Sequence, residues 1–264
     1  MFCCISHKGR GWLLGFLAAG LCLVLWPWSA PGQVLLAWAL GLALLTFILW
    51  ASADVCSGIY LKARCRNARQ VAVVALTFDD GPCAQSTEIL DLLKAYGAKA
   101  TFFVVGSRME GQRKLLLRML AEGHQLGNHS WAHRSWFPLL RPALMRKEIM
   151  RTQAEIEKLG GGTCRFFRPP FGVTNPFLAK ALKGSALEVA GWSIRSLDTR
   201  NEAPEVVFKR IIRRLKGGEV VLLHDSSAPV VPVLKLLLPW LVEHNLQSLT
   251  LDAFFGEGTK KYPL

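Results

Sequence analysis

The chain has no Asp, Glu, Lys, Arg or His between Gly11 and Ala53, and this uncharged run restricts its possible folds more than any other feature. A turn rich in Pro and Gly, residues 27–32, divides the run into two apolar segments at about 12–28 and 34–50. A helix that spans a bilayer needs about 17 to 25 apolar residues, so each segment lies near the lower end of that range. We therefore predict an N-terminal membrane hairpin over residues 11–53. A re-entrant hairpin in one leaflet and two buried core helices of a soluble domain are the alternatives.

The charges that flank this run predict the side of the membrane on which the rest of the chain lies. Lys and Arg near membrane ends are preferentially retained in the cytoplasm. Basic residues stand on both sides of the run: Lys8, Arg10, Lys62, Arg64, Arg66 and Arg69. This predicts a protein of the inner (cell) membrane with its catalytic domain on the cytoplasmic side. The periplasmic or extracellular side is the alternative, because "ASAD" at residues 51–54 has the small-x-small form of a signal peptidase site.

Cysteine use and net charge narrow the classes of partner. The 7 cysteines are odd in number and irregularly spaced, which predicts neither a disulfide framework nor a CxxC metal site and suits a reducing compartment. The net charge of +13 favours membrane lipids or a phosphate-bearing substrate. We expect no nucleic acid as a partner, because the chain has neither a helix-turn-helix pattern nor a pattern of stacking aromatic residues.

Short apolar runs alternate with segments of helical spacing beyond Gln70. The expected strands are 71–78, 100–105, 125–127, 165–168, 187–192, 219–223 and 248–251. The expected helices are 87–96, 112–122, 142–159, 176–182, 204–215 and 231–244. Such alternation predicts an α/β fold with parallel strands and outer helices, and this number of strands favours a barrel over an open sheet. We expect a short basic N-terminus (1–10), the membrane hairpin (11–53), a basic linker (54–69) and one catalytic domain (70–264).

Polar residues follow several of these strands, where a parallel barrel gathers its active residues. The set comprises Asp79, Asp80, His129, His133, Arg168, Asp198, His224 and Asp225. His129 and His133, in "HSWAH", can share one ion if that stretch turns helically, and a carboxylate with two imidazoles suits zinc or a similar ion. Successive side chains on a strand point in opposite directions. One member of the Asp79–Asp80 pair can therefore bind the metal while the other takes a proton from water.

Four motifs in this order resemble those of the polysaccharide deacetylases of carbohydrate esterase family 4 (the NodB homology domain), the group that includes chitooligosaccharide deacetylases. They are "LTFDDGP", "HSWAH", "RPPFG" and "VVLLHD". The resemblance implies a distorted (β/α)7 barrel and a divalent metal, commonly zinc, with cobalt, nickel or manganese as alternatives. It implies that Asp79 is the general base and that Asp80, His129 and His133 are the metal ligands. Arg168 resembles the arginine that orients the base.

The same resemblance implies the remaining roles. His224 matches the general acid, and Leu222 matches the apolar wall that receives the acetyl methyl group. Phe171 stands where the family usually has Tyr, at the position whose backbone N–H stabilises the oxyanion. Trp192 and Asp198 match a further motif, in which Asp198 could orient His224.

That last motif departs from the family pattern, because "WSIRSLDT" has Arg195 and Thr199 in place of the usual Asp and Trp. The change puts substrate identity in doubt more than the chemistry. We expect a metal-dependent hydrolase that removes the acetyl group from an N-acetylated amino sugar polymer, an oligosaccharide or a lipid-linked glycan at the membrane. An O-acetyl esterase, an N-deformylase on a lipid-linked sugar and a non-catalytic sugar-binding scaffold are the alternatives.

Overall fold

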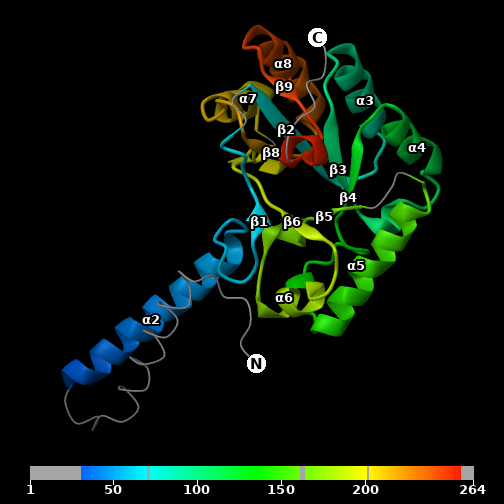
Figure 1. Cartoon of the computed structure of the whole chain (residues 1–264). Helices are drawn as coiled ribbons and strands as arrows, with labels where there is room; N and C mark the ends of the chain where they lie inside the picture. The colour runs from blue at the N-terminus through cyan, green and yellow to red at the C-terminus, as the bar shows by residue number, and fades with distance from the viewer. Residues whose placement is uncertain (1–30, 70–71, 161–163, 201, 257–264) are drawn as a thin grey trace.

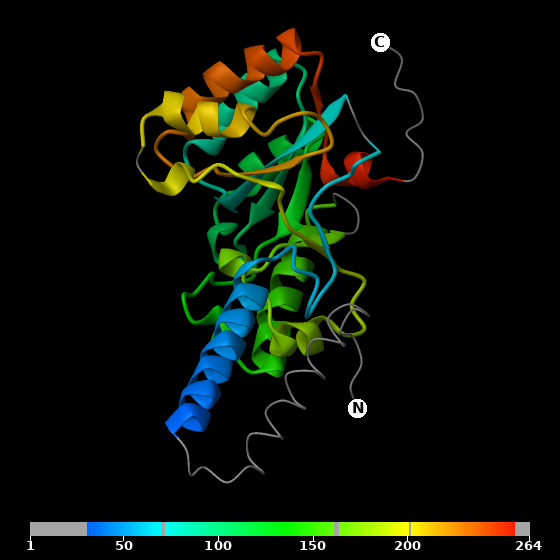
Figure 2. The same ribbon diagram turned by 90° about the vertical axis from the view of Figure 1, so that its left-hand side faces the viewer.

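The structure is a computed structural model and describes residues 31–69, 72–160, 164–200 and 202–256 (Figure 1). The first arm of the predicted hairpin, at about 12–28, lies outside the described residues. The second arm forms helix α2, Pro31–Ala53, which projects away from the rest of the fold in both views (Figures 1 and 2). Within the described residues, Gly32–Ala53 is the one helix long and apolar enough to cross a membrane. Most of its side chains face outward, although a signal sequence near an N-terminus has the same length and composition.

Parallel strands build the wall of an incompletely closed barrel. They are β1 (Ala63–Arg64), β2 (Val73–Gly81), β3 (Ala100–Val104), β4 (Gln125–Asn128), β5 (Phe166–Phe167), β6 (Glu188–Ala190), β7 (Ile194–Arg195), β8 (Val220–His224) and β9 (Gln247–Ser248). Their order is β1-β6-β5-β4-β3-β2-β8-β7, and β9 pairs with β2. All of these ladders are parallel, as the alternating pattern predicts. The chain itself crosses from β6 to β7 through residues 191–193.

Helices cover the outside of this sheet (Figures 1 and 2). They are α3 (Ser86–Ala95), α4 (Arg113–Ala121), α5 (Pro142–Glu157), α6 (Pro176–Leu182), α7 (Pro204–Ile212), α8 (Val230–Glu243) and α9 (Leu251–Phe255), with 3-10 turns η1 (Gly106–Arg108), η2 (Phe137–Leu139), η3 (Pro170–Gly172) and η4 (Asp198–Arg200). The apolar pattern of the sequence predicts a strand over 248–251. That expectation is wrong at its end, because Thr250 caps α9 by accepting a hydrogen bond from Ala253 N–H.

Alternation along the strands separates the core from the barrel interior. On β2, Leu76 and Phe78 pack in the large cluster that also contains apolar residues of α3 and α8. Ala75 belongs instead to the interior cluster. Because side chains alternate along a strand, Thr77 and Asp79 follow Ala75 on the inner face. The same period places Leu222 and His224 on the inner face of β8, beyond Val220 of the interior cluster.

Residues 54–69, which the sequence predicts to be a basic linker, are packed on the sheet. Strand β1 pairs with β6, and Arg66 makes an isolated bridge with Glu219. A disulfide joins Cys56 to Cys65, so the expectation that the cysteines form no disulfide is wrong. The pairing of β1 with β6 folds this short segment back on itself and brings the two cysteines together. Spacing along the chain does not reveal that contact.

Candidate active site

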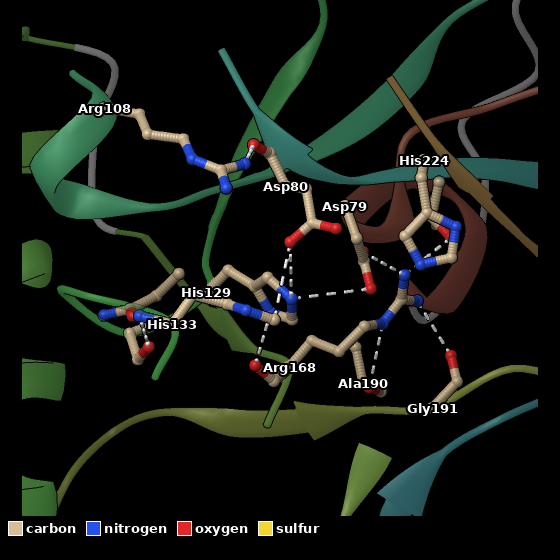
Figure 3. A network of polar contacts seen from close by, with 12 residues as sticks. Asp79, Asp80, Arg108, His129, His133, Arg168, Ala190, Gly191 and His224 are labelled. Carbon is tan, nitrogen blue, oxygen red and sulfur yellow. Dashed lines mark hydrogen bonds and ion pairs between the residues drawn. The ribbon is translucent and has the colours of Figure 1, made fainter. Parts of the chain in front are cut away.

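Two carboxylates, those of Asp79 and Asp80, lie at the carboxyl end of β2 on the rim of the barrel (Figure 3). The register with β3 shifts between Asp79 and Gly81, and Asp80 has a positive φ of 75°. This left-handed residue rotates the chain, so the two side chains do not point in opposite directions as regular alternation predicts. Asp79 Oδ2 lies 3.8 Å and Asp80 Oδ1 3.9 Å from the same atom, His129 Nε2. The bulge therefore aims both carboxylates at one place.

The histidine segment reaches the same place without forming a helix. Ser130 and His133 have positive φ values of 64° and 46°, so the helical turn on which the shared ion was expected to depend is absent here. Side-chain oxygens hold the loop instead. Asn128 Oδ1 accepts from Ser130 N–H at 3.0 Å, and Glu148 Oε2 accepts from Ala132 N–H at 3.1 Å. The loop places the His129 and His133 ring centroids 4.7 Å apart.

Asp80, His129 and His133 fit a divalent metal ion. One ligand atom from each lies within 4.8 Å of the other two, and His133 Nε2 is 3.4 Å from Asp80 Oδ1. Asp80 Oδ1 is buried and has no hydrogen-bond partner among the described residues, which is costly unless a cation satisfies it. His129 Nδ1 is 2.8 Å from the Arg168 carbonyl oxygen, an acceptor, so Nδ1 carries the proton and the Nε2 lone pair faces Asp80.

Electrostatics favour the neutral form of this histidine. Burial, reinforced by neighbouring His133, lowers the pKa of His129 to about 3. A neutral imidazole is the form that binds a metal. The donor set of one carboxylate and two imidazoles is that of many catalytic zinc sites.

Arg168 holds Asp79 from inside the barrel. Its guanidinium has no exposed surface and donates to Asp79 Oδ1 at 2.7 Å and to Thr77 Oγ1 at 2.8 Å. It also donates to the carbonyl oxygens of Ala190 at 3.3 Å and Gly191 at 2.9 Å. Burial lowers the pKa of Arg168, and the charge and hydrogen bond of Asp79 oppose this. The arginine binds Oδ1 of Asp79 and leaves Oδ2 directed at the group formed by Asp80, His129 and His133.

His224 lies on the opposite side of Asp79 from His129 and His133 (Figure 3). It forms an ion pair with Asp198. Its Nδ1 is 2.8 Å from Asp198 Oδ1, and its backbone N–H donates to Asp198 Oδ2 at 2.8 Å. Burial lowers the pKa of His224, but the hydrogen bond and charge of Asp198 outweigh it, and the net pKa is raised. The Nε2 atom is left for a substrate.

The remaining predicted site residues differ in exposure. Phe171 is half exposed in η3 with a positive φ of 60°, and its ring centroid lies 4.8 Å from that of His133. Leu222 is buried. Trp192 packs so closely on Gly172 that a Cβ there would lie 2.3 Å from the indole. The two departures from the motif, Arg195 and Thr199, are exposed, and the Arg195 guanidinium lies 5.9 Å from the Trp192 ring centroid.

Two supporting residues, Arg108 and Ser86, were not predicted from the sequence, and Asp225 was predicted for the rim without a specific role. Arg108 in η1 donates to the carbonyl oxygen of Asp80. Ser86 donates to Asp225 Oδ2 at 2.6 Å, and a Cβ on Gly81 would lie only 2.0 Å from that oxygen. Burial, together with the charges of the nearby Asp80 and Asp79, raises the pKa of Asp225 to about 7. Asp225 was found because it follows a predicted strand next to His224, whereas no spacing rule connects Arg108 to β2.

This chain is similar in sequence to several known proteins. Residues 66–190 match the family described as "Polysaccharide deacetylase". The chain is 36% identical over 184 residues to the peptidoglycan-N-acetylmuramic acid deacetylase PdaC of Bacillus subtilis, covering 68% of this chain and 38% of that protein. It is 31% identical over 186 residues to a peptidoglycan-N-acetylglucosamine deacetylase of Bacillus cereus, covering 68% of this chain and 86% of that protein.

Solved structures show the same fold. The structure of PdaC from Bacillus subtilis superposes with a TM-score of 0.64 at 34% identity, covering 69% of this chain and 89% of that chain. This chain spans about two fifths of the length of the first curated relatives it matches.

Proposed function

Because this chain belongs to the polysaccharide deacetylase family, carbohydrate esterase family 4, we propose that it hydrolyses the acetamide of an N-acetylated amino sugar in a glycan polymer and releases acetate. It would then be a hydrolase acting on carbon–nitrogen bonds other than peptide bonds. The observation that carries the proposal is the position of Asp79. Arg168 fixes one of its oxygens, and the other faces the cluster of Asp80, His129 and His133.

We assign these three residues as the ligands of a divalent ion, zinc by preference for the donor set, with cobalt, nickel or manganese as alternatives. When bound there, such an ion lowers the pKa of water and polarises a substrate carbonyl. The orphaned Asp80 Oδ1 and the inward-facing Nε2 of His129 support the assignment.

Asp79 is the proposed general base. Its Oδ2 lies at the edge of the ligand cluster, 3.8 Å from His129 Nε2, where it can accept a proton from the attacking water. Arg168 orients it through Oδ1. His224 is the proposed general acid, because its pKa is raised and its Nε2 remains available to protonate the leaving nitrogen.

Residues on the rim of the barrel are proposed to contact the substrate. Phe171 is proposed to stabilise the oxyanion through its backbone N–H, a role that does not depend on having Tyr at this position. Leu222 lies on the same face of β8 as His224 and would form the wall for the acetyl methyl group. Trp192 supports the η3 loop through its contact with Gly172.

Peptidoglycan is the substrate class that the relatives favour. The Bacillus subtilis relative is named for N-acetylmuramic acid and the Bacillus cereus relative for N-acetylglucosamine, and we propose one of these sugars as the residue deacetylated. The exposed Arg195 beside Trp192 adds a cation at the rim, which favours an acidic glycan.

We further propose that α2 tethers the domain to the cell membrane with the catalytic domain on its outer side. The disulfide between Cys56 and Cys65 supports this side, because disulfides persist in oxidising compartments. Arg64 and Arg66 pair with Glu188 at 2.7 Å and Glu219 at 2.9 Å. They are thus engaged on the sheet, which weakens the charge argument for the cytoplasm.

The membrane side decides between two substrates. If residues 12–28 and α2 both cross, the predicted hairpin returns the domain to the cytoplasm, where a lipid-linked glycan is the natural substrate. A phosphatase reporter and a fluorescent reporter, each fused after Leu264, distinguish the sides. Phosphatase activity without fluorescence supports the outer side, and the reverse supports the cytoplasm.

Acetate release tests the proposed reaction. Purified protein loaded with zinc should release acetate and expose free amines on N-acetylated peptidoglycan or chitooligosaccharides, and chelation should abolish release. Acetate release from an O-acetylated glycan without free amines would favour an esterase, and formate release from an N-formyl sugar would favour a deformylase. Binding of the glycan with no turnover would favour a sugar-binding scaffold.

A further inference from the structure

The disulfide between Cys56 and Cys65 lies directly behind the carbonyl that holds the active-site arginine. A Cβ placed on Gly191 would lie 2.5 Å from Cys65 Sγ and 3.1 Å from Cys56 Sγ. Both sulfur atoms therefore pack against the Cα of Gly191, together with Val55 Cγ1 at 3.0 Å from the same Cβ position, and only a glycine fits there. The Gly191 carbonyl oxygen accepts a hydrogen bond of 2.9 Å from Arg168 Nη2.

The same segment bonds to the backbone of Gly191 and contacts the backbone of Trp192. Gly191 N–H donates to the Arg64 carbonyl oxygen at 3.0 Å, and Arg64 is in register with Ala190. Cys56 Sγ lies 3.2 Å from the Trp192 carbonyl oxygen. The disulfide thus contacts residues 191–193, which connect β6 to β7. These two strands do not pair with each other, so the barrel wall is open here.

These contacts form a continuous path to the proposed base. The sulfurs support Gly191, the Gly191 carbonyl fixes the Arg168 guanidinium, and Arg168 donates to Asp79 Oδ1 at 2.7 Å. Arg168 is fully buried, so it has no solvent to replace a lost carbonyl partner. Small displacements of a catalytic group have large effects on rate.

We propose that the Cys56–Cys65 disulfide is a positioning element for Arg168 and Asp79, so that its removal lowers turnover without removing the metal ligands. This inference rests on the proposed function for its kinetic consequence but not for its structural one. Cys56, Cys65 and Gly191 are positioning residues, since none of them reaches the reacting atoms.

Compensating substitutions test the proposal. The double variant Cys56→Ala/Cys65→Ala leaves a gap behind Gly191, whereas Gly191→Ala alone forces a collision with the sulfurs. Each should lower kcat by roughly tenfold, an effect well within what misplacement of a catalytic group produces. The triple variant Cys56→Ala/Cys65→Ala/Gly191→Ala refills the gap with the new methyl group. It should therefore turn over faster than either parent.

A disulfide that only stabilises the fold predicts another result. In that case Gly191→Ala would not improve the double variant, and this outcome would overturn the proposal. Cys164→Ala is the matched control, because Cys164 is a buried free cysteine of the core cluster. It should lower the melting temperature and leave kcat per folded chain unchanged. A thiol-free phosphine reductant should slow the wild type and leave the double variant unaffected.

Crystal structures make the test independent of the reaction. In the double variant the distance from Arg168 Nη2 to Gly191 O should exceed hydrogen-bonding range, and in the triple variant it should return. An unchanged distance in the double variant would refute the positioning role. If the oxidised wild type releases no acetate from any N-acetylated glycan, the proposed function fails, while these distances still decide the positioning role.

Discussion

Asp198 holds His224 at two points. One carboxylate oxygen lies 2.8 Å from the imidazole Nδ1, and the other accepts the backbone N–H of the same histidine at 2.8 Å. Ser196 Oγ donates to Asp198 Oδ1 at 2.8 Å and fixes the carboxylate. Burial alone would lower the pKa of His224, but these Asp198 interactions raise it. His224 therefore keeps its proton to higher pH than an ordinary histidine, as a general acid requires.

Replacing Asp198 should move the alkaline limb of the pH profile. In Asp198→Asn the pKa of His224 falls, so the imidazole loses its proton at lower pH and kcat/KM declines earlier as the pH rises. At alkaline pH the loss should approach the roughly 10²- to 10⁴-fold contribution typical of general acid catalysis. Thr199→Ala, an exposed neighbour, is the control and should leave the limb in place. If the alkaline limb of Asp198→Asn lay at the same pH as that of the wild type, Asp198 would have no role in the proton transfer by His224.

Metal content should depend on His129. His129→Ala removes the buried imidazole whose Nε2 faces Asp80, and metal affinity should fall by at least roughly 10²-fold, because even changes outside the ligand shell cost 10- to 100-fold. Equilibrium dialysis with zinc measures this without any substrate. His244→Ala, at the exposed end of α8, should bind like the wild type. Equal zinc binding by both variants would show that His129 is not a ligand.

Gly81 should tolerate no side chain. In Gly81→Ala the new Cβ would lie 2.0 Å from Asp225 Oδ2, an oxygen already bonded to Ser86. Overpacking of this kind costs about 1–3 kcal/mol of unfolding free energy. The end of β2 must shift, which also displaces Asp79 and Asp80. Denaturant titration and acetate release measure the two effects, and a variant equal to the wild type in both would contradict the packing described here.

The order of the longer strands and of most helices was predictable because each of these strands is a distinct apolar run followed by a polar residue, whereas the two-residue strands β1 and β7 and the short helix α9 were not predicted. Asp79, His129, Arg168 and His224 follow four such runs, and parallel strands bring their ends to one rim. What the alternation rule missed is the left-handed conformation of Asp80, which is set by the bulge between β2 and β3. Backbone conformations of this kind depend on tertiary contacts.

The disulfide is a second feature that could not be predicted from the sequence. Cys56 and Cys65 pair because β1 lies beside β6, a strand more than a hundred residues later in the chain. Within the described residues Cys83 and Cys164 remain free thiols. An odd number of irregularly spaced cysteines therefore does not exclude a single disulfide. The ion pairs of Arg64 with Glu188 and of Arg66 with Glu219 likewise depend on the fold and cannot be read from spacing along the chain.

In the proposed site Asp80, His129 and His133 bind the ion, and Asp79 is left to accept a proton. Metal content and acetate release measured together on Asp79→Asn test this assignment most directly, since Asn keeps the shape and an acceptor for Arg168 but is not basic. We predict about one zinc ion per folded chain, as in the wild type, with a loss of acetate release of roughly 10²- to 10⁴-fold. Loss of zinc together with activity would make Asp79 a ligand, and full turnover with zinc bound would remove it from the role of base.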